Sequence, residues 1–434
     1  MIDLYSRLIR HSGNQNLFRV IEMSVAAIVN ERPFHIQAEG PRGTGKTTIM
    51  RAARALLPPI TRIKDCLYNC HPAVPHCPAH RNLSQEAIAA LGVEQVPRPF
   101  LEISQAAKLG TVVGSIDLAK LTSPADQLAA LLPGTIPQAH RGIIFIDEIN
   151  RLADTAPELA DVLLDVMGTR PGRVQIEEPG LPVAELPVAV SIWAASNPDE
   201  DPGPLRRIRK QLSDRFDVAV TMGRPDNFRT VAAILAGQTY ETQETEVLST
   251  ANLPLSGRLE DIEVSQEVRE LLGKIYLEFG LESLRSITAM ETAACLTAML
   301  DGRTVAGITD LAQIAPLVLA HRVSPDDLVA IQSYLYKMLY GQDSMVARKK
   351  TPPSLKERLF PANFWAAVIT RAAALINKRG GLPGKTGKGA AGEQETARIV
   401  DPLNTTIVAP PKPAVPLARL PDEQLVTRSR KPHG

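Results

Sequence analysis

A glycine-rich stretch from Gly40 to Thr47 carries the clearest chemical signal in this sequence. It fits the pattern G-x-x-x-x-G-K-[ST] of a phosphate-binding loop. In such a loop the glycines let backbone N–H groups turn toward the phosphates, Lys46 reaches the β- and γ-phosphates, and the Thr47 hydroxyl holds Mg²⁺. The alternative is a glycine-rich turn that fits the pattern by chance. The residues expected to bind ATP here are Gly40, Pro41, Arg42, Gly43, Thr44, Gly45, Lys46, Thr47 and Thr48.

Two predicted strands end in polar side chains that suit ATP hydrolysis. The apolar run 143–146 reads as a buried parallel strand that delivers Asp147 and Glu148 at its carboxyl end. Asp147 is expected to bind Mg²⁺ through water, and Glu148 to polarise the attacking water. The buried run 188–195 leads to Asn197, whose amide would position that water. The alternatives are an ordinary strand followed by solvated acids and an Asn-Pro turn.

Three of the four cysteines and a histidine lie within one short insertion, residues 62–82. Their spacing is C-x3-C-x6-C-x2-H, and the residues are Cys66, Cys70, Cys77 and His80. Thiolate and imidazole ligands at such spacings close a tetrahedral zinc site, which would hold together an insertion that lacks a core of its own. An iron–sulfur cluster and unligated thiols are the alternatives, because the spacing is not the familiar paired C-x2-C. Cys295 is expected in the core.

These groups must be positioned by an α/β domain with a parallel central sheet. Residues 1–32 look helical, residues 34–38 form the strand before the phosphate loop, and residues 47–57 form the helix after it. Hairpins are expected at 112–118 and 174–183, and an amphipathic helix at 157–167. The domains predicted are an α/β domain over 1–230, a helical domain over 231–345 and a largely disordered tail over 346–434, which is rich in Pro, Gly and Lys.

Composition narrows the function classes. The 434 residues include 48 Lys and Arg against 47 Asp and Glu, so no global positive charge favours nucleic acid or anionic lipid. Aromatic residues make up 4% of the chain, which leaves few platforms for stacking bases. No apolar run is long enough to span a membrane, and the first residues lack a signal-peptide core. We therefore expect a cytoplasmic protein, in which cysteines are thiols or metal ligands.

The order of these motifs resembles that of the AAA+ ATPases, which combine a phosphate loop, an acidic strand end, a polar sensor and an arginine before a helical lid domain. Several stretches are similar to the clade that holds the magnesium chelatase ATPase subunit and the MoxR proteins, and the likeness covers roughly Ile2 to Ser333. The stretches are Ala139-His140-Arg141-Gly142, Asp161-Val162-Leu163-Leu164-Asp165-Val166, Asn197-Pro198, Leu212-Ser213-Asp214-Arg215-Phe216 and Ala320-His321-Arg322.

The resemblance implies a ring, usually a hexamer, with ATP bound between subunits. Arg215 would be an arginine finger that acts on the neighbouring subunit's γ-phosphate, with Asp214 supporting it, and Arg285 would be a sensor arginine that contacts the same subunit's nucleotide. A surface salt bridge for Arg215 and a solvated charge for Arg285 are the alternatives. The resemblance also implies a partner subunit with a von Willebrand A domain.

Three functions are compatible with these motifs. The first is the motor subunit of a magnesium-chelatase-type enzyme, which would couple ATP hydrolysis to metal insertion into a tetrapyrrole. The second is a MoxR-like ATPase that remodels a protein client with a von Willebrand A-domain partner. The third is a nucleic-acid motor, which the near-neutral charge and scarce aromatics disfavour.

Overall fold

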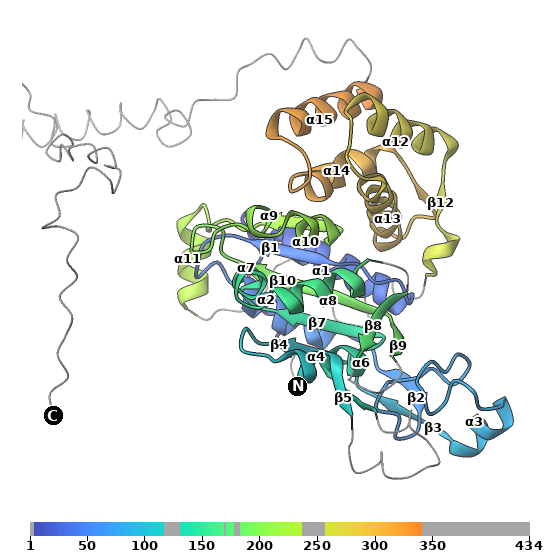
Figure 1. Ribbon diagram of the computed structural model, residues 1–434. Coiled ribbons are helices and arrows are strands. Elements are labelled where there is room, and N and C mark those ends of the chain that lie inside the picture. Colours follow the sequence, from blue (N-terminus) through green and yellow to red (C-terminus); the bar gives the residue numbers. More distant parts are fainter. Residues whose placement is uncertain (1–3, 117–130, 169–170, 178–182, 237–256, 341–434) are drawn as a thin grey trace, which may run out of the picture. The chain divides into compact units, whose positions relative to one another are not determined.

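The computed structural model describes residues 4–116, 131–168, 171–177, 183–236 and 257–340. Its centre is a five-stranded sheet in the order β11-β1-β10-β7-β4, and all four strand pairs are parallel (Figure 1). These strands are β1 (Ile36–Glu39), β4 (Phe100–Ile103), β7 (Gly142–Ile146), β10 (Val190–Ser196) and β11 (Val218–Thr221). The predicted parallel α/β architecture is confirmed.

Alternating side chains of the central strands pack into two separate cores. In β7, Ile143 and Phe145 belong to one core, whereas Ile144 and Ile146 belong to the other. This is the period of two expected when both faces of a sheet are covered, and it explains why the strand reads as an unbroken apolar run. The helix α1 (Gln15–Val29) packs in the first core, and α8 (Pro157–Val166) packs in the second.

Most predicted elements are found, with shifted ends. The first helix covers Gln15–Val29 and not residues 1–32. The helix after the phosphate loop is α2 (Lys46–Ala52), and it tightens into a 3₁₀ turn at Ala53–Leu56. The hairpin predicted at 174–183 consists of β8 (Gly172–Ile176) and β9 (Ala184–Val188). Its return arm lies later than expected, and residues 178–182 lie outside the described part.

A hairpin confined to residues 112–118 was a wrong prediction. Helix α4 (Leu109–Val113) ends at Gly114, where β5 (Gly114–Ile116) begins and pairs with the distant β6 (Leu131–Pro133). A Cβ on Gly114 would lie 2.7 Å from the Leu132 carbonyl oxygen, and its φ of +129° suits glycine. The glycine therefore permits a close strand approach and does not make the turn itself. Asp117 and Leu118 lie outside the described residues.

The cysteine insertion is carried by a two-stranded antiparallel sheet that the sequence did not predict. Strand β2 (Ile60–Ile63) pairs with β3 (Val93–Val96), and helix α3 (Gln85–Leu91) precedes β3. The shorter helices around the central sheet are α6 (Thr135–Gln138), α7 (Ile149–Thr155), α9 (Leu205–Ile208), α10 (Lys210–Arg215) and α11 (Phe228–Leu235).

The C-terminal part of the described chain is helical, as predicted. Its main helices are α12 (Gln266–Glu278), α13 (Leu284–Leu300), α14 (Ile308–Leu319) and α15 (Pro325–Tyr340). A 3₁₀ turn at Leu259–Asp261 and a two-stranded parallel ladder of β12 (Glu263–Val264) and β13 (Val305–Ala306) add to them. The weakly patterned connection 237–256 and the predicted tail lie outside the described residues. None of the described helices is long and apolar enough to cross a membrane.

Candidate functional site: a nucleotide cavity, an arginine pocket and a cysteine cluster

The phosphate loop connects β1 to α2, as its pattern requires. Gly43 and Gly45 have φ values of +74° and +85°, and a Cβ on Gly43 would meet no atom within 4 Å. Such left-handed positions let successive N–H groups face one concave surface, and only glycine adopts them without strain. The loop therefore has the backbone of an anion cradle, and α2 adds the positive end of its dipole.

Lys46 and Thr47 point into this cradle. The Lys46 ammonium donates to the carbonyl oxygens of Gly40 at 2.6 Å and Pro41 at 2.9 Å. Burial lowers the pKa of Lys46, and the Asp147 and Glu200 carboxylates partly offset that effect. The Thr47 hydroxyl lies 3.2 and 3.3 Å from the two Asp147 carboxylate oxygens. A hydroxyl beside a carboxylate is a pair of oxygen ligands suited to Mg²⁺.

Glu148 follows Asp147 in a left-handed conformation with φ of +52°, directly before α7. Its Oε2 accepts a hydrogen bond of 2.6 Å from the Gln105 side-chain amide and lies 3.3 Å from Nε of Arg151. The predicted base is thus held by two side chains that sequence reasoning missed. Gln105 follows β4, the neighbour of β7 in the sheet, and that adjacency was the one available signal.

Asn197 lies beyond the carboxyl end of β10, between the strands that carry the phosphate loop and the acids. Its side-chain amide donates to Glu200, and Glu200 is also paired with Arg42 and, at 3.3 Å, with Arg151. Sequence reasoning missed Glu200. This carboxylate therefore connects Arg42 of the phosphate loop, Asn197 and Arg151 of α7.

These groups line one cavity of about 300 Å³. Its lining consists of Arg42, Gly43, Thr44, Gly45, Lys46, Thr47, Thr48, Asp147, Glu148, Ser196 and Asn197. Backbone N–H groups, one lysine and paired oxygen ligands meet there. This combination of groups fits a nucleoside triphosphate with Mg²⁺. Gly40 lies beside it, where a Cβ would approach the Met222 carbonyl oxygen to 2.8 Å.

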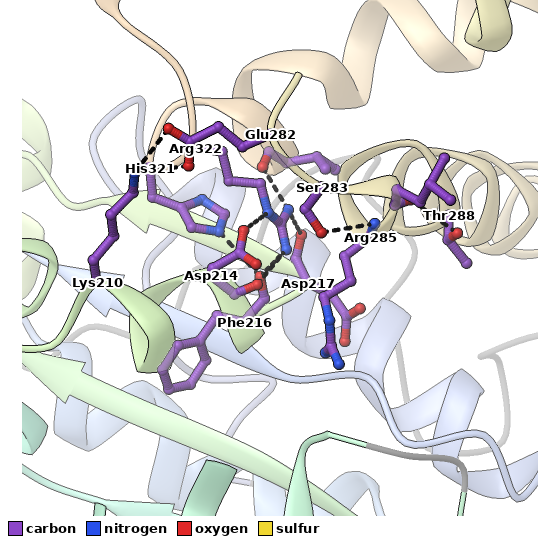
Figure 2. A network of polar contacts seen from close by, with 12 residues as sticks. Lys210, Asp214, Phe216, Asp217, Glu282, Ser283, Arg285, Thr288, His321 and Arg322 are labelled. Atoms are coloured by element: carbon purple, nitrogen blue, oxygen red, sulfur yellow. Dashed lines mark hydrogen bonds and ion pairs between the residues drawn. The ribbon is translucent and has the colours of Figure 1, made fainter. Parts of the chain in front are cut away.

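Arg215 and Arg285 lie in a different pocket, also of about 300 Å³, whose lining shares no residue with that cavity. Both arginines donate to the carbonyl oxygen of Gly168, just beyond α8, at 3.4 Å from Arg215 and 2.7 Å from Arg285. Burial, and then the Arg285 charge, lower the pKa of Arg215. Figure 2 shows the Arg285 side chain near the polar network around Arg322. The expected neighbourhood of Arg285 with its own phosphate loop is not seen.

The predicted cysteine ligands come together. The ligand atoms of Cys66, Cys70, Cys77 and His80 all lie within 4.8 Å of one another, and the three cysteines are buried. The Cys70 sulfur accepts backbone N–H groups of His76 and Cys77, each at 3.3 Å. Such donors stabilise a thiolate. Three sulfurs and one imidazole nitrogen in this arrangement fit a tetrahedral zinc ion.

The cysteine cluster also packs against the start of β7. The ring of His76 stacks on the ring of His140 with centroids 3.8 Å apart, and His140 precedes β7 by two residues. His76 Nδ1 lies 3.2 Å from the Cys70 sulfur. Burial lowers the pKa of His76 to about 4, so its ring is neutral at physiological pH. His76 therefore lies behind the Cys70 ligand and is not one of the four clustered ligand residues.

Comparison with known protein families agrees with this geometry. A family model described as "Magnesium chelatase, subunit ChlI" matches residues 12–200, and one described as "AAA lid domain" matches residues 269–332. The chain is similar to the "Magnesium-chelatase 38 kDa subunit" of Acidiphilium rubrum, with 33% identity over 306 residues, which cover 68% of this chain and 84% of the relative. It is 28% identical to the "Magnesium-chelatase subunit ChlI" of Nephroselmis olivacea, over 72% of this chain and 88% of that one.

Among solved structures, the chain is similar to a cryo-EM-based model of the complex between subunits BchI and BchD of magnesium chelatase. The identity is 25%, the TM-score is 0.42, and the match covers 75% of this chain and 98% of that one. The identity to the Acidiphilium rubrum subunit and the length that it covers establish the relationship. This chain belongs to the family of magnesium-chelatase ATPase subunits, and it is an ATP-hydrolysing AAA+ motor.

Proposed function

We propose that two copies of this chain share each ATP molecule within a ring. The observation that carries the proposal is the division of the predicted site residues between two pockets. Lys46, Asp147 and Glu148 line one pocket, whereas Arg215 lines another with which it has no residue in common. A finger so placed reaches a γ-phosphate only when a second copy brings its phosphate loop to the Arg215 pocket. The ring that we propose is a hexamer.

Within the cavity the residues divide the chemistry. Thr47 and Asp147 would hold Mg²⁺, which neutralises phosphate charge when it is bound. Lys46 and the loop N–H groups bind the phosphates, Asn197 orients the attacking water, and Glu148 polarises it. Arg215 of the neighbouring copy stabilises charge that develops on the γ-phosphoryl group. Because Arg285 donates to the same carbonyl as Arg215, we assign it to the neighbour's nucleotide and not to its own.

The work done by this motor is proposed from the family. ATP hydrolysis by this chain would drive the movement of a partner subunit, and that movement would insert magnesium into a tetrapyrrole. The partner would carry a von Willebrand A domain, and the assembly would be cytoplasmic. The relatives named as magnesium-chelatase subunits favour this assignment over a MoxR-like remodeller of other clients and over a nucleic-acid motor. A Glu148→Gln trap held in ATP should retain a tetrapyrrole-binding subunit. Retention of DNA, or of an unrelated client alone, would contradict the assignment.

Mixing two inactive variants tests the shared site directly. Lys46→Ala removes the phosphate contact, and Arg215→Ala removes the finger and should lower turnover by about 10³–10⁵-fold with ATP binding nearly intact. In a mixture, an Arg215→Ala cavity can meet the intact arginine of a Lys46→Ala copy, so ATPase activity should return. If the mixture stays as inactive as each variant, or if Arg215→Ala hydrolyses ATP at the parental rate, the shared site is wrong.

We also propose that Cys66, Cys70, Cys77 and His80 bind a structural zinc ion. Close contacts between the thiols support it: hydrogen bonds from Cys70 and Cys77 lower the pKa of Cys66, whereas hydrogen bonds with Cys66 and Cys70 raise the pKa of Cys77. The four candidate ligand atoms also already lie within 4.8 Å of one another. Metal analysis of the purified chain should find about one zinc per chain, lost in Cys77→Ser and kept in Cys295→Ala. Iron with a visible absorption band would indicate an iron–sulfur cluster. The absence of both zinc and iron would refute the site.

A further inference from the structure

Arg322 has no assigned role, yet it lies at the centre of the polar network drawn in Figure 2. It follows α14, and its side chain is only 4% exposed. A buried guanidinium is costly unless its N–H groups are satisfied, because it has left the water that would solvate them. Arg322 lies where the helical domain meets α10, so its partners come from both.

The five N–H groups of Arg322 make five contacts, almost all with the end of α10. Nε lies 3.2 Å from Oδ1 of Asp214, and Nη2 donates to the carbonyl oxygens of Asp214 at 3.0 Å and Phe216 at 2.6 Å. Nη1 donates to the carbonyl oxygens of Asp217 at 3.1 Å and Val318 at 2.7 Å. Carbonyls at the end of a helix lack partners within it, so a planar fork of donors is well matched to them.

These contacts are made to the residues on both sides of Arg215, the proposed arginine finger. Arg215 ends α10, and the residues on both sides of it, Asp214 and Phe216, give their carbonyl oxygens to Arg322. His321 adds a hydrogen bond of 3.0 Å to the Phe216 carbonyl. Within the described residues, the Arg215 side chain makes one long hydrogen bond of 3.4 Å, to the Gly168 carbonyl oxygen. Its backbone is therefore held by the helical domain, while its guanidinium stays available in the pocket.

We infer that Arg322 is a positioning residue for the arginine finger, and that it makes the helical domain and Arg215 move as one unit. The inference rests on the proposed sharing of ATP between copies. Arg285 extends from α13 of the same helical domain into the Arg215 pocket. A displacement of the helical domain in one copy then shifts both arginines that face the neighbour's phosphates. Arg322 is thus a mechanical link from one copy's helical domain to the next copy's ATP.

The first test separates turnover from binding. Arg322→Lys keeps the charge but loses the planar fork, and it should lower kcat by about 10–100-fold with the KM for ATP changed less than about threefold. Arg322→Ala should lower kcat at least as far. The matched control is Arg206→Ala. Arg206 is an exposed arginine close to Arg322, and it donates to the carbonyl oxygens of Arg322 and Val323 at 3.3 and 3.2 Å. It should keep the parental kcat. Parental kcat in Arg322→Lys and Arg322→Ala would overturn the inference.

The second test asks through which copy Arg322 acts. An Arg322→Ala copy has an intact phosphate loop and a misplaced finger, so mixing it with Lys46→Ala should restore ATPase activity. Mixing it with Arg215→Ala should not, because both copies then lack a working finger. Recovery in the Arg215→Ala and Lys46→Ala mixture but not in the Arg322→Ala and Lys46→Ala mixture overturns this inference alone. No recovery in either mixture overturns the shared site, and with it this inference.

Discussion

The hydrogen bond between Gln105 and Glu148 leads to a prediction about basal activity. One carboxylate oxygen of Glu148, Oε2, is held by Gln105 at 2.6 Å and lies 3.3 Å from Arg151. Glu148 already lines the cavity, but its Oε2 can polarise water beside the γ-phosphate only after it leaves the Gln105 amide. The two contacts therefore oppose the first step of hydrolysis, and Gln105→Ala should raise the rate of ATP cleavage.

The size of the effect follows from the nature of the bond. A hydrogen bond to an ionised group contributes about 1.5–3 kcal/mol, and because Gln105 is exposed to water we take the lower end. A barrier lower by about 1.4 kcal/mol corresponds to about tenfold in rate. We therefore expect the single-turnover rate constant to rise by up to about tenfold. ATP affinity should hardly change, because Gln105 is not among the residues that line the cavity.

Single-turnover hydrolysis with enzyme in excess over ATP measures this step without product release. Gln95→Ala is a matched control, since Gln95 is an exposed glutamine on β3, in the sheet that carries the cysteine insertion. It should leave the rate unchanged. A rate for Gln105→Ala that falls toward that of Glu148→Gln would refute the reasoning, because Gln105 would then be presenting the carboxylate to water and not restraining it.

Two further predictions concern the helical domain. Burial, and then the Arg322 charge, hold the pKa of His321 well below 6.5, so below about pH 6.5 the unfolded chain gains a proton that the folded chain refuses. As the pH falls further, this residue should lower the free energy of unfolding by about 1.4 kcal/mol per pH unit. Denaturant titrations at several pH values should show that the free energy of unfolding of His321→Gln depends less steeply on pH. Asp310, which is 2% exposed, accepts from the Gly307 N–H at 2.9 Å and from Arg303. Asp310→Ala should cost about 2–4 kcal/mol in thermal unfolding, and a cost no larger than that of the exposed Glu260→Ala would contradict this.

The sequence predicted best where a residue's role depends on its immediate neighbours. The apolar run before Asp147 fixes a buried strand, and a parallel strand in a covered sheet delivers its next residues to the carboxyl edge. The glycines of the phosphate loop act through their own backbone angles. The four candidate zinc ligands lie close enough in the chain for their spacing to imply contact.

The sequence could not supply partners that meet from distant segments. Gln105 lies 43 residues before Glu148, and Arg322 lies 108 residues after Asp214. Neither residue has a flanking pattern that names its partner, since a lone polar side chain in a loop is compatible with many contacts. Arg285 shows the same limit, because a short match predicted its chemistry but not which pocket it would enter.

In the ring proposed above, each copy turns its phosphate-loop cavity toward one neighbour and its Arg215 pocket toward the other, so the proposed contact between copies is head-to-tail. An open row of copies would end in an arginine pocket without ATP on one side and in an ATP cavity without an arginine on the other. Only closure into a circle puts every copy to use. Turnover per chain should therefore rise with protein concentration until circles are complete, and a copy that lacks both Lys46 and Arg215 should silence the two junctions that it forms.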